Sequence, residues 1–94
     1  MTQADLPAQD SRAWMEKAAI DLRAARALRE AGILSAALFH CQQAAEKSFK
    51  AFPTWHGIPF RRVHDIEETG ALCISVEPAL HAIVKLAEPL TAYA

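Results

Sequence analysis

The chain has 94 residues, and its 10 lysines and arginines nearly balance 11 aspartates and glutamates, giving a formal net charge of -1. This length suits a single domain with one hydrophobic core. So neutral a composition excludes a protein built around a long nucleic-acid contact, which needs a basic excess, although it is compatible with a local basic patch. With 52% hydrophobic residues, twenty alanines and three glycines, the chain is expected to adopt an all-α fold.

Cysteine content and targeting signals narrow the class of protein further. Cys41 and Cys73 form no CxxC pair and are too few for a disulfide scaffold, so we expect both to be small buried residues. The N-terminal segment lacks the basic and apolar regions of a signal peptide, and no apolar run approaches the length of a membrane span. The histidines do not have the spacing of metal ligands. We therefore expect a cytoplasmic protein with no membrane contact, no bound metal and no cofactor.

The first helix is expected to follow a short tail. Residues 1–9 are predicted to form a flexible N-terminal tail, and residues 10–94 a single helical domain. Asp10 or Ser11 is the expected N-cap, because either side chain can accept hydrogen bonds from the first turn. Gly32 is the expected stop. Apolar residues recur every three or four positions and predict one buried face, made of Trp14, Ala18, Leu22, Ala25 and Leu28.

The second helix is predicted to begin near Ser35. Its apolar stripe is wide, which is typical of a helix that is covered on more than one side. Pro53 has no N–H group, and its ring clashes with the carbonyl four residues earlier, so we expect the helix to kink or end there. The main stripe consists of Leu38, Cys41, Ala45, Phe49 and Phe52.

Two shorter helices are predicted in the C-terminal third. Asp65 is the expected N-cap of the third helix, with Glu68 at the spacing of a capping box. Gly70 is expected to lie inside this helix or to end it. The fourth helix is predicted over about residues 76–88, and Pro89 is expected to break it. Residues 90–94 leave room for the start of a truncated fifth helix.

The segment FHCQQAAEKSFKA, residues 39–51, is the most distinctive part of the sequence, and it resembles the signature helix of the HEPN domain family. Upstream, the residues around Trp14 and Asp21 are similar to the first helix of that family. Downstream, Gly57 and the sequence HDIE at 64–67 are similar to the start of its third helix. The resemblance covers about residues 12–93.

This resemblance implies both a fold and a cellular role. The implied fold is an up-and-down bundle of four main helices that commonly forms homodimers. The implied role is linked to nucleotides or RNA, because many members are encoded beside a minimal nucleotidyltransferase as a toxin–antitoxin pair. We therefore expect a partner module of such a nucleotidyltransferase, with a nucleotide or RNA as candidate ligand.

One branch of the family consists of metal-independent ribonucleases, which carry an Arg and, after four to six intervening residues, a His. None of the four histidines of this chain has an Arg at that spacing, so we predict no catalytic residues. Two alternatives stay open. One is a ribonuclease toxin with a non-standard site, and the other is a purely structural dimerisation module, which the wide apolar surface of the second helix favours.

Basic residues in and after the signature helix are the candidates for a phosphate-binding site. Lys47 and Lys50 can project two ammonium groups from one helix face, since they are three residues apart. Arg61 and Arg62 precede the third helix, whose N-terminus offers backbone donors to an anion. The predicted nucleotide- or phosphate-binding set is Lys47, Lys50, Arg61, Arg62 and His64. The alternative is that the lysines are solvated on the helix exterior and that His64 supports the loop.

Four further polar residues are expected to line a polar pocket or to serve a structural role. Asp21 and Glu46 each lie beside the apolar stripe of their helix, which allows a pocket shared by two helices. The alternative is an ion pair or hydrogen bond between helices, with Lys47, Lys50 or Arg26 as the partner. The complete set is Asp21, Gln43, Glu46 and Asp65.

Overall fold

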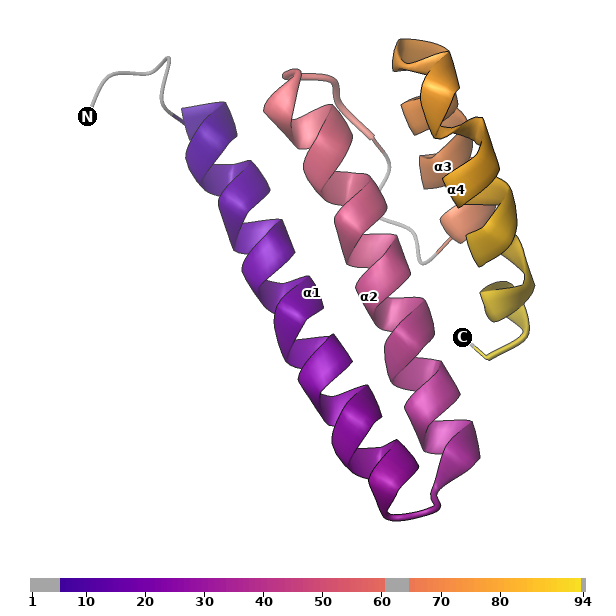
Figure 1. The fold of residues 1–94 in the computed structure, drawn as a ribbon. Coiled ribbons are helices and arrows are strands. Elements are labelled where there is room, and N and C mark those ends of the chain that lie inside the picture. Colours follow the sequence, from indigo (N-terminus) through magenta and orange to yellow (C-terminus); the bar gives the residue numbers. More distant parts are fainter. Residues whose placement is uncertain (1–5, 61–64, 94) are drawn as a thin grey trace.

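Two helical hairpins make up the fold (Figure 1). The computed structural model describes residues 6–60 and 65–93. Helices α1 (Leu6–Glu30) and α2 (Leu34–Trp55) form the first hairpin, and α3 (Ile66–Val76) and α4 (His81–Ala87) form the second. Two short 3-10 helices, η2 (Pro78–Leu80) and η3 (Glu88–Tyr93), flank α4. The described part of the chain contains no strand, so the predicted all-α helical bundle is confirmed.

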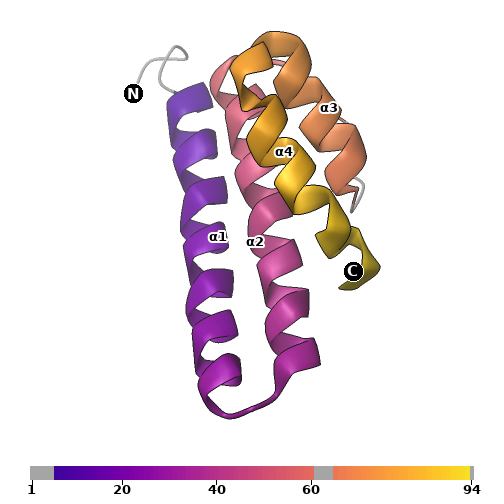
Figure 2. The same cartoon turned by 45° about the vertical axis from the view of Figure 1, so that its right-hand side comes forward.

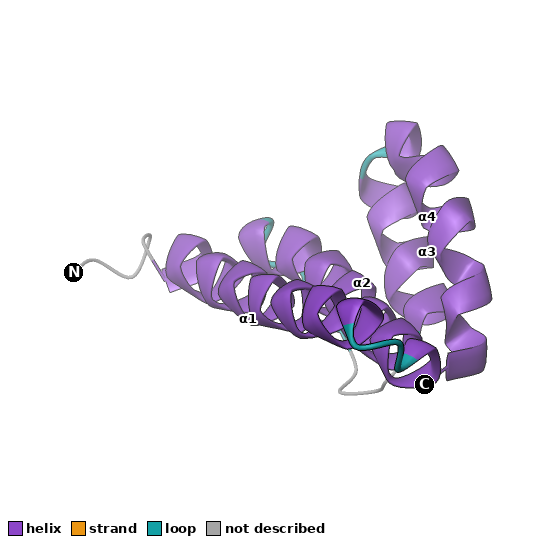
Figure 3. Ribbon diagram, turned by 60° about the horizontal axis from the view of Figure 1, so that its bottom comes forward, coloured by secondary structure: helices purple, strands orange, loops and turns teal. Residues whose placement is uncertain are grey.

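Helix α2 makes the packing contacts between the two hairpins. It packs along α1 and also contacts α3 and η3. In Figure 2, α1 and α2 lie side by side over their full length, while the second hairpin lies at the C-terminal half of α2, which it contacts through α3. Figure 3 shows that the second hairpin rises at a steep angle from the layer of α1 and α2. None of the helices in the described ranges is long and apolar enough to cross a membrane.

The first two helices begin earlier than predicted. Helix α1 begins at Leu6 and contains Pro7 in its first turn. Backbone N–H groups in the first turn of a helix have no acceptor within the helix, so the N–H that proline lacks costs no hydrogen bond there. The predicted tail is therefore wrong for residues 6–9, and residues 1–5 lie outside the described residues. Ser11 does not cap α1 but donates a hydrogen bond to the Ala51 carbonyl of α2, at 2.8 Å. Helix α2 begins at Leu34, without a side-chain cap.

The buried side chains of α1 are smaller than predicted. Its buried residues are Ala18, Asp21 and Ala25. Leu22, which was expected on this face, is 43% exposed. Small side chains at the interface let the backbones of α1 and α2 approach closely along their length, and this leaves the leucine at the edge of the contact.

Of the two predicted effects of Pro53, a kink or an end of the helix, the end is wrong. The helix continues to Trp55 with Pro53 inside it. Proline has no N–H to donate to the Phe49 carbonyl, four residues earlier. That carbonyl accepts a bond from the Cys73 thiol of α3 instead, at 3.2 Å. Burial raises the pKa of the Cys73 thiol to about 11, so the proton that makes this bond is retained at neutral pH.

The C-terminal region follows the predicted order with different boundaries. The Asp65 carboxylate accepts bonds from the backbone N–H groups of Glu67 and Glu68, at 2.9 and 3.1 Å, so the predicted N-cap of α3 is confirmed. The single fourth helix predicted over 76–88 is instead divided into η2 and α4. The division follows from Pro78, which is the first residue of η2, and from Glu77, which is the N-cap of η2. Helix α4 ends at Ala87, just before Pro89 as predicted, and the 3-10 helix η3 continues the chain through the proline.

Gly70 lies inside α3, where the second hairpin is most tightly packed. A Cβ atom at this position would lie 2.5 Å from Cγ1 of Val84 in α4. Val84 belongs to the buried core together with Phe49, Ile66 and Cys73. The missing side chain at position 70 therefore sets how closely α3 and α4 approach.

We predict that Gly70→Ala destabilises the protein by about 1–3 kcal/mol, the usual cost of overpacking a core. In a solvent-exposed helix the same change would stabilise by about 1 kcal/mol. Urea unfolding followed by circular dichroism measures the difference. In the Gly70→Ala/Val84→Ala variant, the cost should be clearly less than the sum of the two single costs, because truncation of Val84 makes room. Strictly additive costs would contradict this packing argument.

Candidate functional site

A row of buried polar side chains runs along α2 at the spacing of one helical turn. Gln42 and Glu46 are 0% and 1% exposed, and Lys50 is also buried. Lys50 Nζ donates to Glu46 Oε1 at 2.7 Å, and Gln42 Nε2 donates to Glu46 Oε2 at 3.3 Å. Gln43 Nε2 in turn donates to Gln42 Oε1 at 2.7 Å. Buried charges cost free energy unless they are paired and hydrogen-bonded, and this row meets both conditions.

A second polar cluster links α1 to α2 through Asp21. His40 Nδ1 lies 2.9 Å from Asp21 Oδ1, and Lys47 Nζ donates to Asp21 Oδ2. Burial alone would raise the pKa of Asp21, but the hydrogen bonds and charges of Lys47 and His40 outweigh it and hold the pKa below its ordinary value. Asp21 is therefore an ionised carboxylate at neutral pH, bound across the helix interface.

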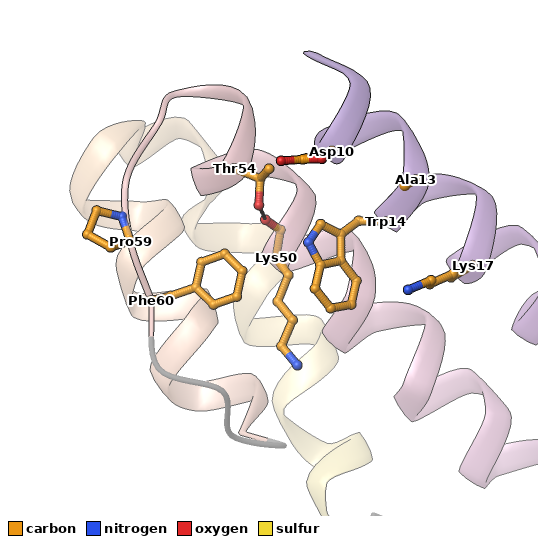
Figure 4. Close-up of a pocket in the computed structure, with 8 residues that line it drawn as sticks. All are labelled: Asp10, Ala13, Trp14, Lys17, Lys50, Thr54, Pro59 and Phe60. Carbon is orange, nitrogen blue, oxygen red and sulfur yellow. Dashed lines mark hydrogen bonds between the residues drawn. The ribbon is translucent and has the colours of Figure 1, made fainter. Parts of the chain in front are cut away.

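An open hollow of about 680 Å³ lies where the N-terminal half of α1 meets the end of α2 (Figure 4). We call it the Trp14 hollow; the rings of Trp14 and Phe60 line it with centroids 6.3 Å apart and planes tilted by 58°. The ammonium groups of Lys17 and Lys50 each lie 5.2 Å from the centroid of the Trp14 ring. This distance is within the range of cation–π interactions. The remaining lining residues are Asp10, Ala13, Thr54 and Pro59.

The Trp14 hollow combines the two features that suit a nucleotide. Aromatic faces stack on nucleobases without strong sequence preference, and ammonium groups attract phosphate. Lys17 and Lys50 differ in whether a carboxylate offsets their charge. Lys50 forms an ion pair with Glu46. Lys17 is exposed and has no carboxylate partner within the part of the chain that is described. Lys17 is thus the better placed group for a phosphate, and Asp10 at the hollow disfavours a highly charged anion beside it.

The structure separates the two lysines that were predicted to act together. Lys47 pairs with Asp21 on α1, whereas Lys50 pairs with Glu46 on its own helix. Of the two, only Lys50 lines the Trp14 hollow. The expectation that both are solvated on the helix exterior does not hold, since Lys50 is buried and Lys47 is partly buried. Arg61, Arg62 and His64 lie outside the described residues.

The four residues expected in a polar pocket take separate places. Asp21 forms the ion pair between helices that was its structural alternative, while Glu46 pairs within α2. Gln43 extends the buried row, and Asp65 caps α3. No three His, Cys, Asp or Glu side chains gather into a metal-binding group among residues 6–60 and 65–93.

Sequence reasoning missed His40, Gln42, Trp14 and Lys17 as members of polar or binding clusters. Gln42 carried a usable signal, because it lies four residues before Glu46, which lies four before Lys50. Trp14 and Lys17 are three residues apart on α1 and form a similar pair. Nothing in the sequence joined His40 to Asp21, since that contact depends on the register of α1 against α2.

Comparison with known proteins gives one match. A family model described as HEPN domain matches residues 11–94. No curated protein and no solved structure matches the chain. The matched range includes every residue of the two polar clusters and, apart from Asp10, every residue that lines the Trp14 hollow.

We predict that Asp21→Asn lowers the free energy of unfolding at pH 7 by about 1–3 kcal/mol, because it removes charge-assisted bonds to Lys47 and His40. The pKa of Asp21 is depressed, so its contribution is present above the pKa of the unfolded chain, about 4. The contribution is lost as pH falls through the lower folded value. The difference between wild type and variant should therefore shrink below about pH 4.

Urea unfolding at pH 7 and pH 3 measures this effect. Asp10→Asn is the matched control, because it removes an exposed carboxylate from the same helix; it should change stability little at either pH. A difference between wild type and Asp21→Asn that is as large at pH 3 as at pH 7 would show that the ion pair is not its cause.

Proposed function

The chain belongs to the HEPN domain family, and from this premise we propose that it is a nucleotide- or RNA-binding module. In this proposal it acts as the partner of a minimal nucleotidyltransferase, in a two-component system of the toxin–antitoxin type. Two kinds of support are combined: the family supplies the link to nucleotides and nucleotidyltransferases, and the structure supplies a hollow of suitable chemistry.

The observation that carries the binding function is that two ammonium groups lie near the Trp14 ring, which is also beside the ring of Phe60. A base could stack on the indole, and its phosphate would then be within the field of Lys17. The hollow of about 680 Å³ is in the usual size range of small-molecule sites. Arg61 and Arg62 follow Phe60 directly in the sequence, His64 comes two residues after Arg62, and all three remain candidates for further phosphate contacts.

A binding function is favoured over the ribonuclease alternative by the chemistry of the histidines. No His follows an Arg at the spacing of the ribonuclease motif. The ring of His40 is bound to Asp21, which is itself bound to Lys47. The structure describes three histidines, His40, His56 and His81. None of them lines the Trp14 hollow. It therefore has no described imidazole for proton transfer.

We predict that ATP, GTP or a short single-stranded RNA quenches the fluorescence of Trp14 in a saturable manner. Trp55 is well exposed, so Trp55→Phe leaves Trp14 as the single tryptophan with little expected effect on the fold. In that background, Lys17→Ala should weaken binding about tenfold, which corresponds to ~1.4 kcal/mol. Fluorescence titration and calorimetry provide the measurement.

Lys85→Ala is the matched control, because Lys85 is an exposed lysine of α4 and does not line the hollow. It should bind like the parent protein. Equal affinity of the Lys17→Ala and Lys85→Ala variants would exclude the Trp14 hollow as the site. Cleavage of the RNA in EDTA by protein of wild-type sequence would favour the ribonuclease alternative instead.

The partnership gives a separate prediction. A purified minimal nucleotidyltransferase from the same organism should form a stoichiometric complex with this chain at micromolar concentration. Size-exclusion chromatography with light scattering would detect the complex and would also give the oligomeric state of the chain alone, for which we propose a homodimer. Independent elution of the two proteins, with and without ATP, would contradict the partnership while leaving nucleotide binding intact.

A further inference from the structure

A second hollow lies at the opposite end of the α1–α2 hairpin from the Trp14 hollow. Its volume is about 460 Å³, and both helices line it close to the turn at Gly32. We call it the leucine–arginine groove. The residues that matter for its chemistry are Leu22, Arg26, Arg29, Leu34, Leu38 and Cys41.

The groove has an unusual combination of exposed leucines and basic groups. Leu22 and Leu34 are 43% and 61% exposed although they face a concave surface. Arg26 and Arg29 are also exposed, and neither guanidinium is bound by a carboxylate of the described chain. Within the described ranges, the lining of the groove contains no acidic residue. An occupant is therefore favoured if it presents apolar side chains to the groove and carboxylates to the two arginines.

We propose that the leucine–arginine groove docks an acidic amphipathic helix of a partner protein. Such a helix would place large apolar residues at positions i, i+4 and i+7 between Leu22 and Leu34, with Asp or Glu at its edges facing Arg26 and Arg29. The groove is formed by residues 22–41, whereas the Trp14 hollow is formed by residues 10–17 and 50–60. Docking here is therefore independent of nucleotide binding.

The groove contains its own chemical probe. Cys41 lines it and is partly exposed, whereas Cys73 is buried with its pKa raised to about 11. N-ethylmaleimide should therefore modify Cys41 and spare Cys73 in the folded protein. Mass spectrometry of the two thiols then reports occupancy of the groove at Cys41 and integrity of the fold at Cys73, in one experiment.

The test uses a synthetic helical peptide of about 18 residues, a length at which helices begin to be stable in water. The peptide carries leucines at i, i+4 and i+7 and glutamates on the flanks, and a second peptide has lysine at each glutamate position. We expect the glutamate peptide at saturation to slow alkylation of Cys41 at least tenfold, an effect that weakens with salt. The lysine peptide should give little protection.

Charge reversal makes the test specific. Arg26→Glu/Arg29→Glu should abolish protection by the glutamate peptide and create protection by the lysine peptide. Arg12→Glu/Arg23→Glu is the matched control, because it reverses two exposed arginines of the same helix that do not line the groove; it should leave the preference for the glutamate peptide unchanged. Rapid alkylation of Cys73 in any variant would identify loss of folding.

Two results would overturn the proposal. Equal protection by the two peptides would show that the groove binds their leucines and does not distinguish the charges that flank them. Protection of Cys41 that rises with protein concentration in the absence of peptide would show that a second copy of the chain covers the groove. Neither result affects the Trp14 titration, so the two sites can fail separately.

Discussion

Helix α2 is packed on two sides, and this constraint determines where its polar side chains find their partners. A surface helix can direct its charged groups into water, but the C-terminal half of α2 has α1 on one side and the second hairpin on another. Glu46 and Lys50 are consequently buried, and they are bound to each other within the helix. The same constraint explains the bond from Cys73 to Phe49, because the carbonyl freed by Pro53 is buried and needs a donor.

The α1–α2 hairpin is thereby divided into three parts with different chemistry. Its middle is closed by small residues and by the Asp21 cluster, which fixes the register of the two helices. The Trp14 hollow lies between the two helices at the open end of the hairpin, and the leucine–arginine groove lies between them near the turn. The polar centre separates the two concave surfaces, so the two proposed ligands would bind at different ends of the hairpin.

The sequence predicted the helical class and the N-cap at Asp65 because these depend on local composition and spacing. It predicted a wide, doubly covered α2 for the same reason. The continuation of α2 through Pro53 could not be predicted, since it depends on a donor from α3 that lies far away in the sequence. The same is true of the site: the spacing of Lys47 and Lys50 indicates one helix face, but their different partners are set by contacts with Asp21 and Glu46.

The net charge of -1 conceals how the charges are distributed. Asp21 and Glu46 are buried acids, and each is paired with a lysine of the signature helix. Cations without a described carboxylate partner are found on α1, with Lys17 at the Trp14 hollow and Arg26 and Arg29 at the groove. The composition excludes a long nucleic-acid contact, but local attraction for phosphate or carboxylate depends on these few exposed groups. In this chain the pair of Asp21 on α1 with Lys47 on α2 links the two helices of the hairpin, and the basic groups of α1 are the charges that a ligand would meet.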